Sequence, residues 1–140
     1  MKKLLIFLML LNTAHAESWQ CNSKTTFDDG WTKELNVTIS IENDAIKYLS
    51  VESCIGSGQE GGGSCCLFDS NEVLSNGGKY RLTNSYHVFS TPDATSKFLI
   101  HRQPNALVIE TDIDRYYCGF SSEVPSTIKI KKGISNCQIH

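Results

Sequence analysis

Apolar and polar side chains alternate along residues 35–42, and this alternation constrains the fold more than any other feature of the chain. The apolar positions are Leu35, Val37, Ile39 and Ile41. A period of two is typical of a strand with one buried and one solvent-exposed face. Turn-forming residues stand on both sides, Asp-Asp-Gly at 28–30 and Asn-Asp at 43–44. We therefore predict a three-strand meander over residues 18–27, 31–42 and 45–53.

Short apolar segments separated by turn signals continue to the C-terminus. Thr-Pro-Asp-Ala at 91–94 and Pro-Asn at 104–105 indicate reversals of the chain. The predicted strands are 80–90, 97–103, 106–111, 114–121 and 127–132, with one short helix within 67–75 and an edge segment at 135–140 held by its cysteine. The predicted fold is all-β, a small antiparallel barrel or sandwich of about eight strands stabilised by disulfides.

The N-terminal residues have the composition of an export signal. Two lysines precede an apolar run at residues 4–11, and Ala-His-Ala at 14–16 offers the small side chains that signal peptidase needs. We therefore predict a signal peptide at residues 1–16 and a single mature domain at residues 17–140. The apolar run is too short to cross a bilayer, which takes roughly 20 residues. The expected location is periplasmic or secreted, with no membrane span.

The mature domain would carry an even number of cysteines, which in an oxidising compartment predicts three disulfides. The six are Cys21, Cys54, Cys65, Cys66, Cys118 and Cys137. We pair Cys21 with Cys137, because this bond closes the longest loop and restricts the unfolded chain most. The neighbours Cys65 and Cys66 point to opposite faces of a strand, so one is expected to bond to Cys54 and the other to Cys118. The sequence leaves open which takes which partner.

Charge and cysteine spacing argue against several classes of protein. The signal takes two of the 13 basic residues with it, which leaves 11 against 15 acidic residues and a formal charge of −4. Nucleic acids and anionic lipid surfaces bind clustered positive charge, so a cationic protein is the better-matched partner. No Cys-x-x-Cys spacing is present, so we expect no metal site, no redox-active pair and no cofactor.

Catalytic motifs are sparse. His87 and His101 lie in predicted strands, and neither stands beside a serine or cysteine in a nucleophile motif such as Gly-x-Ser-x-Gly. Trp19 and Trp31 are interpreted as core or sheet-face residues. We therefore predict no catalytic residue and no enzymatic turnover.

Residues 54–66 interrupt the strand pattern. Five of these thirteen residues are glycine, and no apolar period survives. A phosphate-binding loop would need a following helix and a lysine, which do not accompany it. Two interpretations remain, a flexible connector or a recognition loop held by cysteines on a rigid scaffold. The second interpretation places the candidate binding residues at Ser57, Gly58, Gln59 and Glu60.

Both ends of the mature chain resemble a known family. Trp19-Gln20-Cys21 near the start, and residues 127–131 followed by Asn136-Cys137-Gln138 near the end, are similar to the terminal strands of the small periplasmic inhibitors of C-type lysozyme. The resemblance implies a small β-barrel that blocks lysozyme with a Ser/Gly loop and a basic side chain. It would assign the loop to Ser57-Gly58 and the basic residue to Lys131.

These observations predict an exported binding protein of the periplasm or the extracellular space. The expected role is that of an inhibitor or immunity-type protein that acts by steric occlusion, with a cationic, lysozyme-like hydrolase as its partner. A structural, envelope-associated β module is the first alternative, and an exported hydrolase or toxin is the second.

Overall fold

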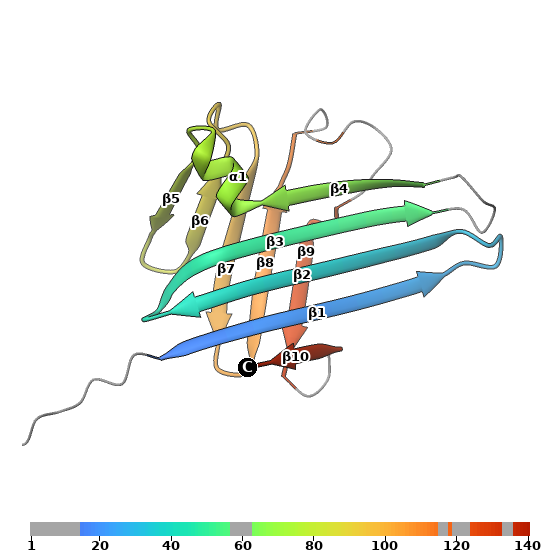
Figure 1. Cartoon of the computed structure of the whole chain (residues 1–140), viewed down its shortest axis with the longest axis horizontal. Helices are drawn as coiled ribbons and strands as arrows, with labels where there is room; N and C mark the ends of the chain where they lie inside the picture. The colour runs from blue at the N-terminus through green and yellow to red at the C-terminus, as the bar shows by residue number, and fades with distance from the viewer. Residues whose placement is uncertain (1–14, 57–62, 115–117, 119–123, 133–135) are drawn as a thin grey trace, which may run out of the picture.

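The computed structural model describes residues 15–56, 63–114, 118, 124–132 and 136–140. Ten strands there form two antiparallel sheets of five strands each, here called sheet A and sheet B (Figure 1). The predicted all-β fold is confirmed. It is a sandwich, because the strand pairings of the described residues leave each sheet with its own edges and do not close them into a barrel.

Sheet A is built mainly from the N-terminal meander. Its strands, in order across the sheet, are β10 (Cys137–Ile139), β1 (Ala16–Thr26), β2 (Thr32–Glu42), β3 (Ala45–Gly56) and β4 (Gly63–Asp69). The predicted meander of β1, β2 and β3 is confirmed. The C-terminal segment is the predicted edge strand, in which Ile139 pairs with Trp19 and Cys137 with Cys21.

A short helix and a second meander follow. The helix α1 (Ser70–Ser75) begins at Asp69, whose carboxylate accepts hydrogen bonds from the N–H groups of Asn71 and Glu72 at 2.9 and 3.2 Å. Sheet B contains, in order, β5 (Lys79–Leu82), β6 (His87–Ser90), β7 (Lys97–Gln103), β8 (Ala106–Asp112) and β9 (Thr127–Lys131). Within the described ranges, no helix is long and apolar enough to cross a membrane.

Of two predicted elements in the middle of the chain, one is wrong in its bounds and the other is confirmed. The predicted strand at 80–90 is a hairpin of β5 and β6, because polar residues between them form a turn in which the Thr83 N–H donates to the Tyr86 carbonyl at 2.9 Å. The predicted short helix within 67–75 is confirmed as α1, and the first three residues of that range complete β4.

The predicted loop at 54–66 is also shorter than expected. Its first three residues belong to β3 and its last four to β4, where they pair across the two strands. Glycine-rich composition hid this pairing, since the apolar alternation that marks a strand is lost there. In the predicted strand at 114–121, Asp114 lies beyond the end of β8 and Cys118 is not in a strand, and its other residues lie outside the described part of the chain.

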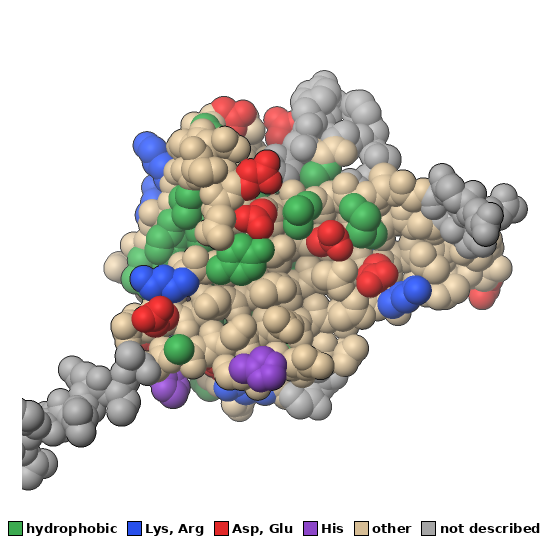
Figure 2. All heavy atoms as spheres, viewed as in Figure 1, with side chains coloured by type: hydrophobic (Ala, Val, Ile, Leu, Met, Phe, Trp, Pro, Cys, Tyr) green, Lys and Arg blue, Asp and Glu red, His purple; other side chains and the backbone are tan. Residues whose placement is uncertain are grey.

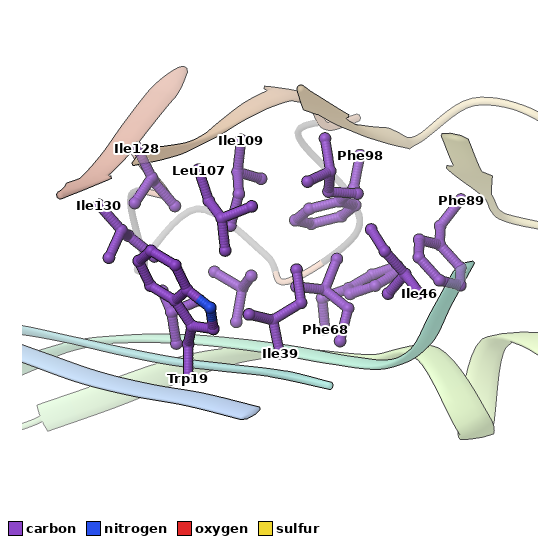
Figure 3. Close-up of a cluster of buried hydrophobic side chains, with 14 of the residues drawn as sticks. Trp19, Ile39, Ile46, Phe68, Phe89, Phe98, Leu107, Ile109, Ile128 and Ile130 are labelled. Carbon is purple, nitrogen blue, oxygen red and sulfur yellow. The ribbon is translucent and has the colours of Figure 1, made fainter. Parts of the chain in front are cut away.

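The core lies between the two sheets, whose strands cross in Figure 1. Its centre is aromatic, because the ring of Phe68 from β4 stacks on Phe98 of β7 at 3.8 Å between centroids and meets Phe89 of β6 edge-on at 6.2 Å. Nearer β9, Trp19 points toward Ile130 of the opposite sheet (Figure 3). The strand β2, in which apolar and polar side chains alternate, supplies further buried side chains, namely Val37, Ile39 and Ile41.

The three predicted disulfides are confirmed. Cys21–Cys137 joins β1 to β10, Cys54–Cys65 joins opposed residues of β3 and β4, and Cys66–Cys118 ties β4 to the connection between β8 and β9. The structure also resolves the choice that the sequence left open. Cys65 lies on the exposed face of β4 and Cys66 is buried, so the two side chains leave the strand in opposite directions.

Candidate functional site

Sheet A extends beyond sheet B at one end. In Figure 1 the ends of β1 to β4 on the right reach past the strands of sheet B. Burial along β1 changes accordingly, since Trp19 is in the core and residues 22–26 are all exposed. We call this end the sheet tip and define it as residues 22–35, 54–56 and 63–65. The strands of sheet B leave its outer end uncovered, from Thr25 to Trp31, so this end is a surface that a partner can reach.

The turn between β1 and β2 forms the outer end of the sheet tip. The Phe27 N–H donates to the Trp31 carbonyl at 2.8 Å, and the Gly30 N–H donates to the Phe27 carbonyl at 3.0 Å. Gly30 has a φ of 85°, a conformation that glycine adopts without strain. The Asp29 carboxylate accepts from the Trp31 N–H at 3.0 Å. The predicted Asp-Asp-Gly turn is therefore confirmed, and its hydrogen bonds restrain the two aromatic residues that flank it.

Those two aromatic side chains are exposed. Phe27 exposes 50% of its surface and Trp31 exposes 45%. The strands β1 and β2 pair without interruption from Thr26–Thr32 to Trp19–Ile39, and successive side chains alternate between the two faces of the sheet. Phe27 and Trp31 therefore lie on the face of the β1–β2 hairpin that carries Leu35. Large aromatic residues contribute much of the binding energy of protein interfaces, so an exposed pair on a restrained turn is a candidate binding surface.

Sequence reasoning did not identify this aromatic pair. Trp19 is in the core as interpreted, with 3% of its surface exposed, but Trp31 lies at the outer turn. The signal that was available is the placement of one aromatic residue on each side of the Asp-Asp-Gly turn. Whether these aromatic residues are buried or exposed depends on how far sheet B covers β1 and β2. The sequence of β1 and β2 does not contain that information.

The candidate loop residues Ser57, Gly58, Gln59 and Glu60 lie outside the described residues. The structure does describe the base of this loop, where Gly56 pairs with Gly63 and the Cys54–Cys65 disulfide follows two residues farther in. A side chain at Gly63 would place its Cβ 3.1 Å from the Ile55 carbonyl oxygen, so the two strands approach closely. Gly56 also pairs with Thr32, next to Trp31. The loop base and the aromatic turn are therefore neighbours at the sheet tip.

The outer face of sheet A carries fixed negative charge. An Asn22 amide N–H donates to Glu34 at 3.1 Å, and the same side chain hydrogen-bonds to Asn36. Asn36 in turn donates to Glu52 at 3.1 Å. Figure 2 shows acidic side chains distributed across this face. The amides hold the two carboxylates in position without neutralising them, and Lys24 of β1 lies directly opposite Glu34 on the same face.

A third carboxylate, that of Asp69, lies farther along the same sheet. The Tyr48 hydroxyl donates to it at 2.8 Å, and this hydrogen bond, with some burial, raises the pKa of Tyr48. Leu67, which pairs with Glu52 across β3 and β4, exposes 47% of its surface. Acidic and apolar groups thus alternate on the outer face, a composition suited to a protein partner.

Lys131 lies on the other sheet. It is an exposed residue in β9, paired with Ala106, and β9 ends beside β10 rather than at the sheet tip (Figure 1). The structure therefore does not bring Lys131 together with the base of the 57–60 loop.

The two strand histidines have hydrogen-bond partners of their own. Nδ1 of His87 lies 2.7 Å from the Tyr80 hydroxyl, and burial, with the positive charge of Arg102, lowers the pKa of His87. Nδ1 of His101 lies 3.0 Å from the Ser85 carbonyl oxygen and donates to it.

A cluster of charges joins the two sheets away from the sheet tip. Glu17 of β1 lies 2.9 Å from Lys132 and 2.9 Å from Arg102, and Arg102 also lies 3.2 Å from Asp44. Burial alone would raise the pKa of Glu17, but Lys132 and Arg102 outweigh it and leave this pKa below its ordinary value. The cluster links β1, β7 and the end of β9, which is a structural role.

Comparisons of the chain with protein-family models, with curated proteins and with solved structures found no match.

Proposed function

We propose that this protein is an exported binding protein, an inhibitor or immunity-type protein that occludes a cationic hydrolase with its sheet tip. The single observation that carries the proposal is the exposed pair Phe27 and Trp31 on a hydrogen-bonded turn. Exposed aromatic side chains of this size mark interaction sites, and tryptophan is among the residues most enriched in binding hot spots.

Preorganisation supports the same function. The turn hydrogen bonds restrain Phe27 and Trp31, and the Cys54–Cys65 disulfide closes the base of the neighbouring loop. A surface that is already ordered loses less conformational entropy on binding, so more of its contact energy appears as affinity. A projecting, cross-linked tip is the shape needed to enter the cleft of an enzyme.

Charge indicates the class of partner. Within the sheet tip, the carboxylates of Asp28, Asp29 and Glu34 outnumber the ammonium groups of Lys24 and Lys33, and Glu52 adds a further carboxylate on the outer face. Complementary charge speeds association and selects among partners. A C-type lysozyme is the first partner to test, because the terminal motifs resemble its periplasmic inhibitors. The signal-like N-terminus and the three disulfides support a periplasmic or secreted location.

Affinity capture with matched variants tests this proposal. Oxidised residues 17–140 are immobilised as wild type, as the tip variant Phe27→Ser/Trp31→Ser, and as the control Leu82→Ser, and each is exposed to host secretions and envelope extracts. Leu82 is 62% exposed in β5 of the other sheet, so it controls for loss of an exposed apolar side chain. We expect a stoichiometric basic protein to be retained by wild type and control and lost from the tip variant. Equal retention by all three, or no specific protein on wild type, would contradict the proposal.

A further inference from the structure

A hollow of about 280 Å³ lies on the outer face of sheet A, where β10, β1 and β2 are neighbours (Figure 1). None of the described residues that line it is charged. Besides Cys21 and Val37, the lining consists of five amides and one hydroxyl, namely Gln20, Asn22, Asn36, Thr38, Asn136 and Gln138. Five of the 13 asparagine and glutamine residues of the chain therefore gather at one place.

Three of these amides form a row across the strands. Asn22 of β1 pairs with Asn36 of β2. On the other side, the Asn22 backbone N–H donates to the Asn136 carbonyl at 3.0 Å, which continues the pairing of β1 with β10. Directly opposed residues of an antiparallel pair lie on the same face, and Val37, next to Asn36, is buried in the core. The asparagine row therefore lies on the outer face, away from sheet B.

A second row lies one position farther along the strands. Gln20 of β1 pairs with Gln138 of β10 on one side and with Thr38 of β2 on the other. Within the described part of the chain, the side chains of these three residues make no hydrogen bond. Both glutamines are exposed. Their amide donors and acceptors are therefore available to a ligand.

The asparagine row, in contrast, is held in a fixed orientation. The Asn22 amide donates to Glu34 at 3.1 Å and to Asn36, and the Asn36 amide donates to Glu52 at 3.1 Å. Because two acceptors engage the amide nitrogen of Asn22, its Oδ1 is the atom left to accept from a ligand. Asparagine is depleted in strands, so an opposed pair in the middle of β1 and β2 indicates a role in binding rather than in strand stability.

We infer that these two rows bind a neutral oligosaccharide. Sugar hydroxyl groups both donate and accept hydrogen bonds, as the amides and the Thr38 hydroxyl do, so the two surfaces complement each other. The six polar side chains carry no charge to select a charged ligand, and Glu52, which holds Asn36, would repel an anion.

The shape and composition of the hollow also restrict the ligand. A peptide or protein partner would bring apolar side chains, for which the two rows offer no apolar pocket. The volume is close to the lower limit for sites of small organic ligands, about 300 Å³, so the hollow holds a short segment of a glycan. The site does not depend on the proposed protein partner.

A nuclear magnetic resonance titration of oxidised, nitrogen-15-labelled residues 17–140 tests the inference. The neutral probes are cellohexaose, maltohexaose and N-acetylchitohexaose, the anionic probe is hexagalacturonate, and pentaglycine offers amides without sugar hydroxyls. We expect saturable shifts of the side-chain amide signals of Gln20, Asn22 and Gln138 with at least one neutral probe, and none with the anion or the peptide. Absence of binding by all three neutral probes, equal binding of the anion or the peptide, or shifts confined to Phe27 and Trp31 would overturn the inference.

Matched variants locate the contacts. Gln20→Ala/Gln138→Ala removes two amides that have no hydrogen bond within the described part of the chain, so its unfolding midpoint should match wild type. The control Asn84→Ala/Gln103→Ala removes two amides on the side of sheet B, one between β5 and β6 and one in β7. We expect the first variant to weaken binding of the neutral probe at least about fivefold and the control to leave it unchanged. Equal affinities of the two variants would contradict the assignment.

Discussion

Removing the disulfide between Cys21 and Cys137 should cost this domain much of its stability. The bond spans a sequence separation of 116 residues, for which loop-closure entropy gives about 4.9 kcal/mol at 25 °C. The Cys66–Cys118 bond shortens the path around this loop, so we expect a loss of about 4 to 5 kcal/mol for Cys21→Ala/Cys137→Ala. Single domains have only about 5–15 kcal/mol in total, so the variant should be close to unfolding.

The Cys54–Cys65 disulfide provides the internal comparison. It spans 11 residues, and the same relation gives about 2.8 kcal/mol. Urea unfolding of oxidised residues 17–140, followed by far-ultraviolet circular dichroism, measures both variants against wild type. The reasoning is refuted if the Cys21–Cys137 variant loses less than about 1 kcal/mol, or less than the Cys54–Cys65 variant, because loop length would then not set the order.

Three further predictions concern pH and the helix cap. Glu17→Gln should lower stability by about 0.5–1 kcal/mol at neutral pH, because its ion pairs with Lys132 and Arg102 are partly exposed. Since the pKa of Glu17 is lowered, this difference should vanish as pH falls below about 4.5, and equal losses at pH 3 and pH 7 would contradict the role of the ion pairs. Burial lowers the pKa of His87 in the folded protein, so His87 of the unfolded chain is protonated at a higher pH than His87 of the folded protein. Stability should therefore fall as pH drops below about 6.5. Thermal melts of His87→Gln should not show this fall. Asp69→Ala should cost about 1–2 kcal/mol in urea unfolding through loss of the N-cap, and an unchanged midpoint would exclude a role for that cap.

The N-terminal meander could be predicted because its sequence contains both of the signals that define it. Alternation at residues 35–42 sets which face is buried, and turn residues at 28–30 and 43–44 set where the strands end. The Cys21–Cys137 pairing followed from loop length, and the general alternation of strand side chains, which sends adjacent cysteines to opposite faces, limited the partners of Cys65 and Cys66. The choice between Cys65 and Cys66 needed the register of β4 against β3, and residues 54–66 have no apolar pattern from which to derive that register.

The sheet tip could not be predicted for a different reason. It depends on how one sheet lies across the other, and strand periodicity says nothing about that placement. Phe27 and Trp31 are exposed because β1 and β2 reach past the strands of sheet B. The hairpin of β5 and β6 was missed for a local reason, since Tyr86 extends an apolar pattern across its turn.

The most direct test of the proposed function is an inhibition titration of C-type lysozyme with oxidised residues 17–140. The proposal predicts that hydrolysis of cell walls falls in proportion to added protein and ends near one equivalent. It also predicts that Phe27→Ser/Trp31→Ser raises the concentration needed by at least about 30-fold, the effect of losing a hot spot of about 2 kcal/mol. Undiminished hydrolysis at a large excess of the wild-type protein would contradict the account, as would equal inhibition by the tip variant.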